Sequence, residues 1–206
     1  PAIEHHAVLE AAKSGEHTII PVNEQGLVDT EEIARAIRPE TRLVSVALAN
    51  NELGTIQPLR DIAEVVREER QRRLDKGDKT PIYLHSDASQ GVGQLDVNVA
   101  RLGVDLLTLN AAKIYGPKQV GLLWAAPSVR LEPLIVGGGQ ERGLRSGTEN
   151  VAGTIGFAVA IERATAHRKY ERDRLAMLRD RLQAKLMGAF SEAVGTSPHA
   201  AARRRR

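Results

Sequence analysis

The residues of this sequence best suited to chemistry lie in two polar segments. The first is His85-Ser-Asp-Ala-Ser-Gln90, and the second contains Lys113. Each segment follows an apolar run typical of a strand, Pro81–Leu84 in the first case and Val104–Leu109 in the second. In α/β sheets, ligands bind where strands end. A carboxylate and an amine at two such ends therefore predict a binding site built on Asp87 and Lys113.

This pair of groups suits pyridoxal 5'-phosphate. The amine of Lys113 can form a Schiff base with the cofactor aldehyde, and the carboxylate of Asp87 can keep the pyridine nitrogen protonated so that the ring accepts electrons. A single aspartate and a single lysine near strand ends are, on their own, usually solvated loop residues. The motifs around them change this interpretation.

Five motifs together resemble the cysteine desulfurases and selenocysteine lyases, which are fold-type I pyridoxal-phosphate enzymes of the aminotransferase class V kind. They occur in the family's order over roughly residues 3 to 190, and the last two favour the sulfur-delivering desulfurase branch. The motifs are Glu4-His-His-Ala-Val-Leu9, Asn50-Asn-Glu-Leu-Gly54, His85-Ser-Asp-Ala-Ser-Gln90, Lys113-Ile-Tyr-Gly-Pro-Lys118 and Gly137-Gly-Gly-Gln-Glu-Arg-Gly-Leu-Arg-Ser-Gly-Thr-Glu-Asn150.

The resemblance implies a role for each matching residue. Lys113 matches the Schiff-base lysine, and Asp87 matches the partner of the pyridine nitrogen. His5 matches a histidine that lies over the cofactor ring and can move protons. Asn51 and Gln90 match residues that hydrogen-bond the phenolic oxygen. Without the resemblance, His5 reads as a helix-start histidine bonded to backbone, and the two amides read as turn residues.

Phosphate binding is where the sequence departs from the family. The family usually has Ser-x-His-Lys at the lysine, whereas this chain has Asn110-Ala-Ala-Lys113, so Asn110 is the expected phosphate donor. Gln119 stands where glycine is common, and its Cβ restricts the backbone there. Thr148 matches a threonine that reaches the phosphate of the opposite subunit, which implies a homodimer with shared sites; its alternative role is a helix N-cap.

The resemblance implies a desulfurase that converts L-cysteine to L-alanine and passes the sulfur to an acceptor or iron–sulfur scaffold protein. That reaction needs a thiolate, and the 206 residues include no cysteine. The family's glycine-rich phosphate turn is absent as well. We therefore expect an inactive fragment of such an enzyme. The alternatives are a non-catalytic remnant or interaction protein, or another class V enzyme such as a selenocysteine lyase or an aminotransferase.

Alternating strand and helix patterns predict the α/β class: a mostly parallel sheet flanked by helices on both faces, as in the large domain of fold-type I pyridoxal-phosphate transferases. We expect the 120–124 strand to be buried, the charge-rich 64–79 segment to be solvated, and Leu175, Leu178, Leu182 and Leu186 to form a core or domain-connecting stripe. Strands are expected at 17–22, 42–48 and 120–124, and helices from Glu4, after the Asp29-Thr-Glu-Glu32 capping signal, from Leu59 and from Val151.

Composition and charge narrow the remaining possibilities. We expect a cofactor-binding domain at 1–160, a connecting helix at 161–190 and an Arg-rich tail at 191–206. Four positive charges lie in the last four residues and the net charge is only +3, so the body is close to neutral and nucleic-acid binding is not favoured. No metal site, membrane span or signal peptide is expected, and the cytoplasm is the default location.

Overall fold

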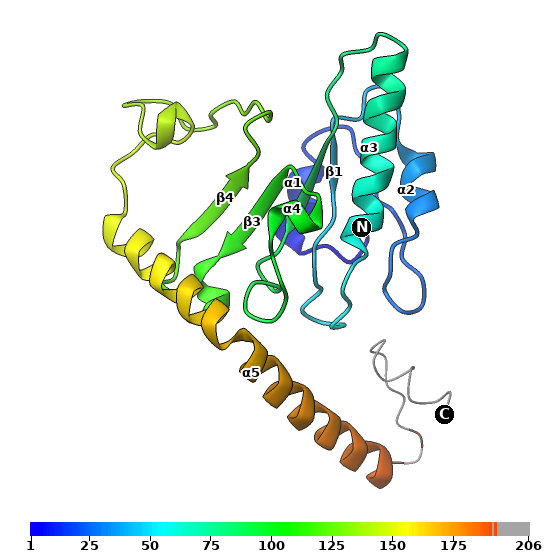
Figure 1. Cartoon of the computed structure of the whole chain (residues 1–206), viewed down its shortest axis with the longest axis vertical. Coiled ribbons are helices and arrows are strands. Elements are labelled where there is room, and N and C mark those ends of the chain that lie inside the picture. The colour runs from blue at the N-terminus through cyan, green and yellow to red at the C-terminus, as the bar shows by residue number, and fades with distance from the viewer. Residues whose placement is uncertain (191, 193–206) are drawn as a thin grey trace.

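Four strands form one sheet in the order β1 (Leu43–Ser45), β2 (Tyr83–Asp87), β3 (Leu106–Asn110) and β4 (Gly121–Ala125) (Figure 1). The computed structural model describes residues 1–190 and 192. β1, β2 and β3 run parallel, and β4 runs antiparallel to β3. The predicted α/β class with a mostly parallel sheet is therefore confirmed.

Helices pack against the sheet and against the helix that follows β3. α3 contacts α2, α4 and β2, while the start of α5 contacts the short helix η1 that follows β3. Figure 1 shows α5 running past the sheet and away from it. The helices are α1 (His6–Ala12), α2 (Thr30–Ala36), α3 (Leu59–Asp75), α4 (Val99–Leu102), η1 (Ala111–Ile114), η2 (Glu141–Gly143) and α5 (Val151–Ala189).

The buried positions follow the strand alternation and the helical spacing that the sequence predicts. In β2, Leu84 and Ser86 are fully buried, whereas the alternate residues Tyr83, His85 and Asp87 are half-buried. In α3, one face is buried through Leu59, Ile62 and Val66, as the helical spacing predicts. The core therefore lies between α3 and one face of the sheet, and Asp87 belongs to the opposite face.

The capping signal before α2 is also confirmed. The Asp29 side chain accepts a hydrogen bond from the N–H of Glu31 at 2.9 Å, which satisfies one of the helix's free donors. Ile33, one turn further on, is buried in the core. The cap and the apolar face therefore both follow from local sequence.

Two predicted strands differ from the structure at the β1 edge. Residues 17–22 form no strand, because none of the strands in the described part of the chain lies beside them to pair with. The strand expected at 42–48 is regular only over Leu43–Ser45, although Val46 and Leu48 still donate to the carbonyl groups of His85 and Asp87. Both differences arise because, among residues 1–190 and 192, β1 has a neighbouring strand, β2, on one side only.

The expected burial of two apolar segments is wrong. In β4, which has only β3 beside it, Leu122 and Leu123 are 40% and 52% exposed. The α5 stripe of Leu175, Leu178, Leu182 and Leu186 is 39–59% exposed, so it packs into no core within the described residues. α5 continues unbroken through position 160, and the predicted tail, apart from residue 192, lies outside the described residues.

The charge-rich 64–79 segment is not wholly solvated, which corrects a further expectation. The Arg73 side chain is only 2% exposed. Its Nε lies 2.6 Å from Oε1 of Glu69, and its other nitrogens donate to the carbonyl groups of Arg38 at 2.9 Å and Thr80 at 3.3 Å. Hydrogen bonds from Arg72 and Arg73 lower the pKa of Glu69 to about 2. This buried pair ties the end of α3 to the start of β2.

Replacing Glu69 with glutamine is expected to lower the free energy of unfolding by about 3 kcal/mol at pH 7, because it leaves the buried Arg73 charge unpaired. The folded-state pKa of Glu69 lies below its ordinary value of 4.5, so its stabilising effect is complete above pH 4.5 and is lost as the pH falls towards 2. Urea unfolding of both proteins across this pH range measures the difference. The exposed neighbour Glu68→Gln serves as the control, and an equal loss in the two variants would contradict the role of Arg73.

Candidate active site

The parallel strands bring most of the predicted site residues to one edge of the sheet. Asp87 is the last residue of β2, and Gln90 lies in the turn that follows it. Asn51 lies in the turn after β1, Asn110 ends β3, and Lys113 lies in η1 immediately afterwards. Because parallel strands end at the same edge, all five residues come from neighbouring loops there.

The Lys113 segment is held by its flanking residues. Ala111 and Ile114 are buried in the core on either side, so Lys113 itself is exposed at the edge of the sheet. The Asn110 side-chain oxygen accepts from the N–H of Ala112 at 3.0 Å and caps η1. This bond leaves the amide nitrogen of Asn110 as the group that could donate to a phosphate.

The first turns of α5 pack closely against the loop that follows Lys113. A Cβ at Gly153 would lie 2.7 Å from Val120 Cγ2, and one at Gly156 would lie 2.6 Å from Pro117 Cγ, so both positions require glycine. In the same loop Gln119 adopts a left-handed φ of 63°, which costs a residue with a Cβ about 1 kcal/mol. The restriction predicted at Gln119 is therefore present, and α5 supports the loop.

The turn after β2 orients Asp87. Its Oδ1 accepts a hydrogen bond from the N–H of Ser89 at 2.9 Å. The Asp87 carbonyl accepts from Leu48, and the next residue, Ala88, donates to the carbonyl of Thr108. Asp87 and Gln90 are both half-buried. The carboxylate is thus fixed at the sheet edge between β1 and β3.

Asn50, which the sequence argument passed over, shapes the turn that carries Asn51. Its Oδ1 accepts from the N–H groups of Glu52 at 2.8 Å and Leu53 at 2.7 Å, and its Nδ2 donates to the Ile3 carbonyl at 2.8 Å. Asn51 itself is exposed. The bond to Ile3 brings the N-terminal residues to the same edge as the β1 turn.

His5 and Thr148 lie outside the strand ends. His5 is the N-cap of α1, and its Nδ1 accepts from the N–H of Ala7 at 3.1 Å, which is the backbone role that the sequence allows. Its place over a cofactor ring stays a prediction. The alternative role of Thr148 as an N-cap is wrong, because Asn150 caps α5 by accepting from Gly153 at 2.9 Å. The contact of Thr148 with a second subunit stays a prediction.

His85 is a further residue that the sequence argument missed. Its Nδ1 lies 2.8 Å from the Ser45 hydroxyl on β1, and its Nε2 lies 2.8 Å from the Thr108 hydroxyl on β3. The ring therefore links all three parallel strands, two residues before Asp87 on the same face. Burial lowers the pKa of His85, and the charge of Asp87 opposes that shift. A polar residue within each of three otherwise apolar runs, Ser45, His85 and Thr108, was the signal that could have revealed it.

The aminotransferase class-V family model matches residues 1–199 of the chain. The chain belongs to the aminotransferase class-V family. Cysteine desulfurase IscS of Clostridium botulinum is 45% identical over 185 residues, which cover 87% of this chain and 44% of that protein. Cysteine desulfurase IscS 1 of Archaeoglobus fulgidus is 45% identical over 186 residues, covering 88% and 46%. The expected relationship to cysteine desulfurases is confirmed, and the chain spans under half the length of these relatives.

Solved structures agree with this assignment. A NifS-like protein superposes with a TM-score of 0.80 at 39% identity, covering 90% of this chain and 50% of that chain. A NifS-like protein from Rickettsia africae superposes with a TM-score of 0.85 at 30% identity, covering 96% and 53%. The sheet and its flanking helices are thus those of fold-type I pyridoxal-phosphate enzymes.

The described residues contain neither a cluster suited to a metal ion nor a helix that could cross a membrane. Within residues 1–190 and 192, no three histidine, aspartate or glutamate side chains are grouped so that they could hold a metal ion. Of the helices in that part of the chain, none has the length and hydropathy needed to cross a membrane.

Because the pKa of folded His85 is lowered, the neutral ring stabilises the fold, and this stability is expected to decline as the pH falls below about 6.5, the value for an unfolded histidine. The decline from one group is at most about 1.4 kcal/mol per pH unit. Denaturant unfolding from pH 8 to pH 5 should show a shallower slope for His85→Gln than for the parent chain. His6→Gln, which alters an exposed ring, should leave the slope unchanged. Equal slopes for all three proteins would contradict the role of the buried ring.

Proposed function

We propose that this chain supplies the cofactor-binding part of a pyridoxal-phosphate-dependent cysteine desulfurase. The observation that carries the proposal is the placement of Asp87 and Lys113 at the ends of adjacent parallel strands, in a class-V chain. One relative of known structure, SspA in complex with cysteine, is 38% identical with a TM-score of 0.70 and covers 78% of this chain and 45% of that chain. That likeness supports L-cysteine as the substrate here.

The donor set at the sheet edge fits the cofactor. A half-buried carboxylate held by a backbone N–H can pair with a protonated pyridine nitrogen, and an exposed lysine one strand away can react with an aldehyde. When bound, pyridoxal phosphate supplies an electron-accepting ring that stabilises negative charge on the substrate's α-carbon. Gln90 and Asn51 would donate to the phenolic oxygen, and Asn110 would donate to the phosphate.

Four residues of this chain would then have defined roles. Asp87 holds a proton on the ring nitrogen, and Lys113, once its amine is free, moves a proton to or from the substrate's α-carbon. His5 would serve as a second proton carrier at the site. In a homodimer, Thr148 would add a hydroxyl donor for the phosphate bound by the neighbouring subunit.

Sulfur transfer needs one group that this chain does not contain. The thiolate that accepts sulfur from cysteine must be a cysteine side chain, and none is present among the 206 residues. We assign that thiol to polypeptide outside these residues. The sulfur then passes to an acceptor or iron–sulfur scaffold protein. Selenocysteine cleavage and amino transfer are the alternative reactions of the same donor set.

Reduction with borohydride after addition of pyridoxal phosphate is expected to attach the pyridoxyl group to Lys113, because Lys113 follows β3 at the sheet edge where Asp87 ends the adjacent strand β2. Peptide mapping by mass spectrometry identifies the modified lysine. Lys113→Ala should abolish the labelling, whereas Lys118→Ala, which removes an exposed lysine of the same motif, should preserve it. Labelling spread over other lysines, or none at all, would refute the assignment.

With cofactor and L-cysteine in D₂O, the chain is expected to exchange the α-proton of cysteine slowly but to release no sulfide above that released by free pyridoxal phosphate. Asp87→Asn should abolish the exchange, since a charge-assisted hydrogen bond worth about 1.5–3 kcal/mol is lost at the ring. The matched control is Asp75→Asn, an exposed change at the far end of α3. Mass spectrometry measures exchange and a sulfide assay measures transfer; unchanged exchange in Asp87→Asn would contradict the proposal.

A further inference from the structure

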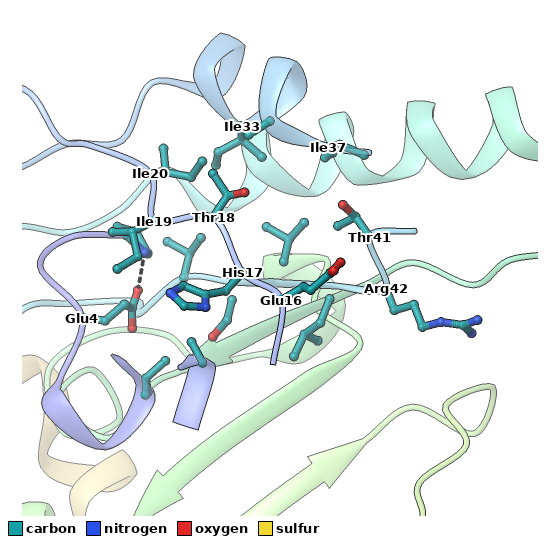
Figure 2. Close-up of a pocket in the computed structure, with 18 of the residues that line it drawn as sticks. Glu4, Glu16, His17, Thr18, Ile19, Ile20, Ile33, Ile37, Thr41 and Arg42 are labelled. Atoms are coloured by element: carbon teal, nitrogen blue, oxygen red, sulfur yellow. Dashed lines mark ion pairs between the residues drawn. The ribbon is translucent and has the colours of Figure 1, made fainter. Parts of the chain in front are cut away.

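A buried carboxyl group, that of Glu4, lies directly beside His5 in the sequence. The Glu4 side chain is only 3% exposed, whereas His5 itself is exposed. Figure 2 shows Glu4 just ahead of α1, with a dashed line for its ion pair with the amino group of Pro1 at 3.4 Å. Glutamate side chains are almost never buried this fully unless they are paired. The partners of Glu4 therefore indicate its role.

The closest partner of Glu4 is the backbone just after β1. Its Oε1 accepts a hydrogen bond from the N–H of Ala47 at 2.8 Å. The neighbours of Ala47, which are Val46 and Leu48, donate their N–H groups to β2. Since backbone groups alternate along an extended chain, the N–H of Ala47 points away from β2 and towards Glu4. This bond attaches the residues at the start of α1 to the end of β1.

A second hydrogen bond holds the residue before Glu4. The side-chain Nδ2 of Asn50 donates to the carbonyl of Ile3 at 2.8 Å. Asn50 lies in the turn after β1, beside the predicted cofactor residue Asn51. Two consecutive residues ahead of His5 are therefore bonded to the part of the chain that leads to the candidate site.

A third bond sets the orientation and the tautomer of the His5 ring. Its Nδ1 accepts from the N–H of Ala7 at 3.1 Å, so a neutral ring carries its proton on Nε2. Within the described residues, Nε2 has no hydrogen-bond partner, and the ring is exposed. Nε2 is thus the ring nitrogen that is free to exchange a proton. The Ala7 bond selects this nitrogen, and the bonds made by Ile3 and Glu4 fix its place.

The surroundings of Glu4 favour its uncharged form. Burial raises the pKa of Glu4, and the charge of Asp87 adds to that rise. The amino group of Pro1 and the hydrogen bond from Ala47 oppose the rise without cancelling it. Its second oxygen, Oε2, is buried without a hydrogen-bond partner in the described part of the chain, which penalises a charge more than a neutral group. A neutral Glu4 adds no second negative charge near Asp87.

We propose that Glu4 is a positioning residue for His5: its buried carboxyl group, bonded to Ala47, holds the start of α1 at the sheet edge so that His5 presents Nε2 to the cofactor. This role rests on the proposed function, which places pyridoxal phosphate at that edge. Glu4 acts through the backbone of its neighbour rather than on the cofactor itself. It acts as a neutral acceptor, so an amide of the same shape can replace it.

Two replacements of similar size test the role of Glu4. Glu4→Gln keeps an acceptor oxygen for Ala47, whereas Glu4→Met fills a similar volume without one. Glu10→Met, an exposed change on α1, is the matched control. Amide hydrogen exchange at Ala47, measured by NMR, should be about tenfold faster in Glu4→Met, because the N–H loses its acceptor, and unchanged in the other two variants. Exchange at the buried Leu84 of β2 reports that each chain is folded.

The decisive measurement follows the His5 ring by NMR when pyridoxal 5'-phosphate is added. The ring signals of His5, identified by their loss in His5→Gln, should shift on addition in the parent chain, in Glu4→Gln and in Glu10→Met. In Glu4→Met the shift should be lost, because the ring is no longer held at the site. Borohydride labelling of Lys113 in the same samples reports that the cofactor is bound.

The outcomes separate this role from the proposed function. A Glu4→Met chain that is labelled at Lys113 and keeps the full His5 shift would overturn the positioning role and leave the proposed function standing. Loss of the shift in Glu4→Gln would show that a carboxylate charge is required, and would overturn the role as a neutral acceptor. A parent chain without labelling at Lys113 would refute the proposed function, and the role of Glu4 with it.

Discussion

Parallel pairing of β1, β2 and β3 requires that all three strands end at the same edge of the sheet, and the site depends on this constraint. Asp87 and Lys113 are separated in the sequence by the whole of β3 and its approach, yet the pairing makes them neighbours in adjacent loops. His85 bonds to hydroxyls on both flanking strands just below that edge. His85, which is hydrogen-bonded to both flanking strands, thus lies two residues before the Asp87 carboxylate.

The three loops at this edge contain the same type of turn. After β1, β2 and β3 respectively, Asn50, Asp87 and Asn110 each accept a hydrogen bond from the N–H two residues further along. Such Asx turns stop a strand without needing a partner element. They also keep the loops short, so the side chains that follow stay close to the sheet. The candidate site is therefore built by local bonds on a framework set by long-range pairing.

Sequence alone could predict what is decided locally. Residues close to one another in the sequence determine the cap at Asp29, the buried face of α3 and the strand before Asp87. It could not predict what depends on distant partners. Residues 17–22 have strand composition but lack a neighbour, Leu122 and Leu123 lie on an edge strand, and Arg73 is buried because carbonyl groups from two other segments converge on it. Charge and hydropathy of a segment cannot report any of these.

Because α5 is long, its first turns pack against the sheet domain while its second half extends into solvent. Its 39 residues span roughly 58 Å at 1.5 Å per residue, but its buried positions are Gly153, Phe157 and Ala160. Arg168 donates to the Leu95 carbonyl at 3.1 Å and lies 3.6 Å from a carboxylate oxygen of Asp96, so it connects the middle of the helix to the sheet domain. Within the described residues, no side chain at 169–189 is buried, and ion pairs such as Arg174–Glu171 join neighbouring turns of the helix surface. On warming, we expect residues 169–189 to lose helical structure at a lower temperature than the sheet, because helices in proteins gain most of their stability from packing.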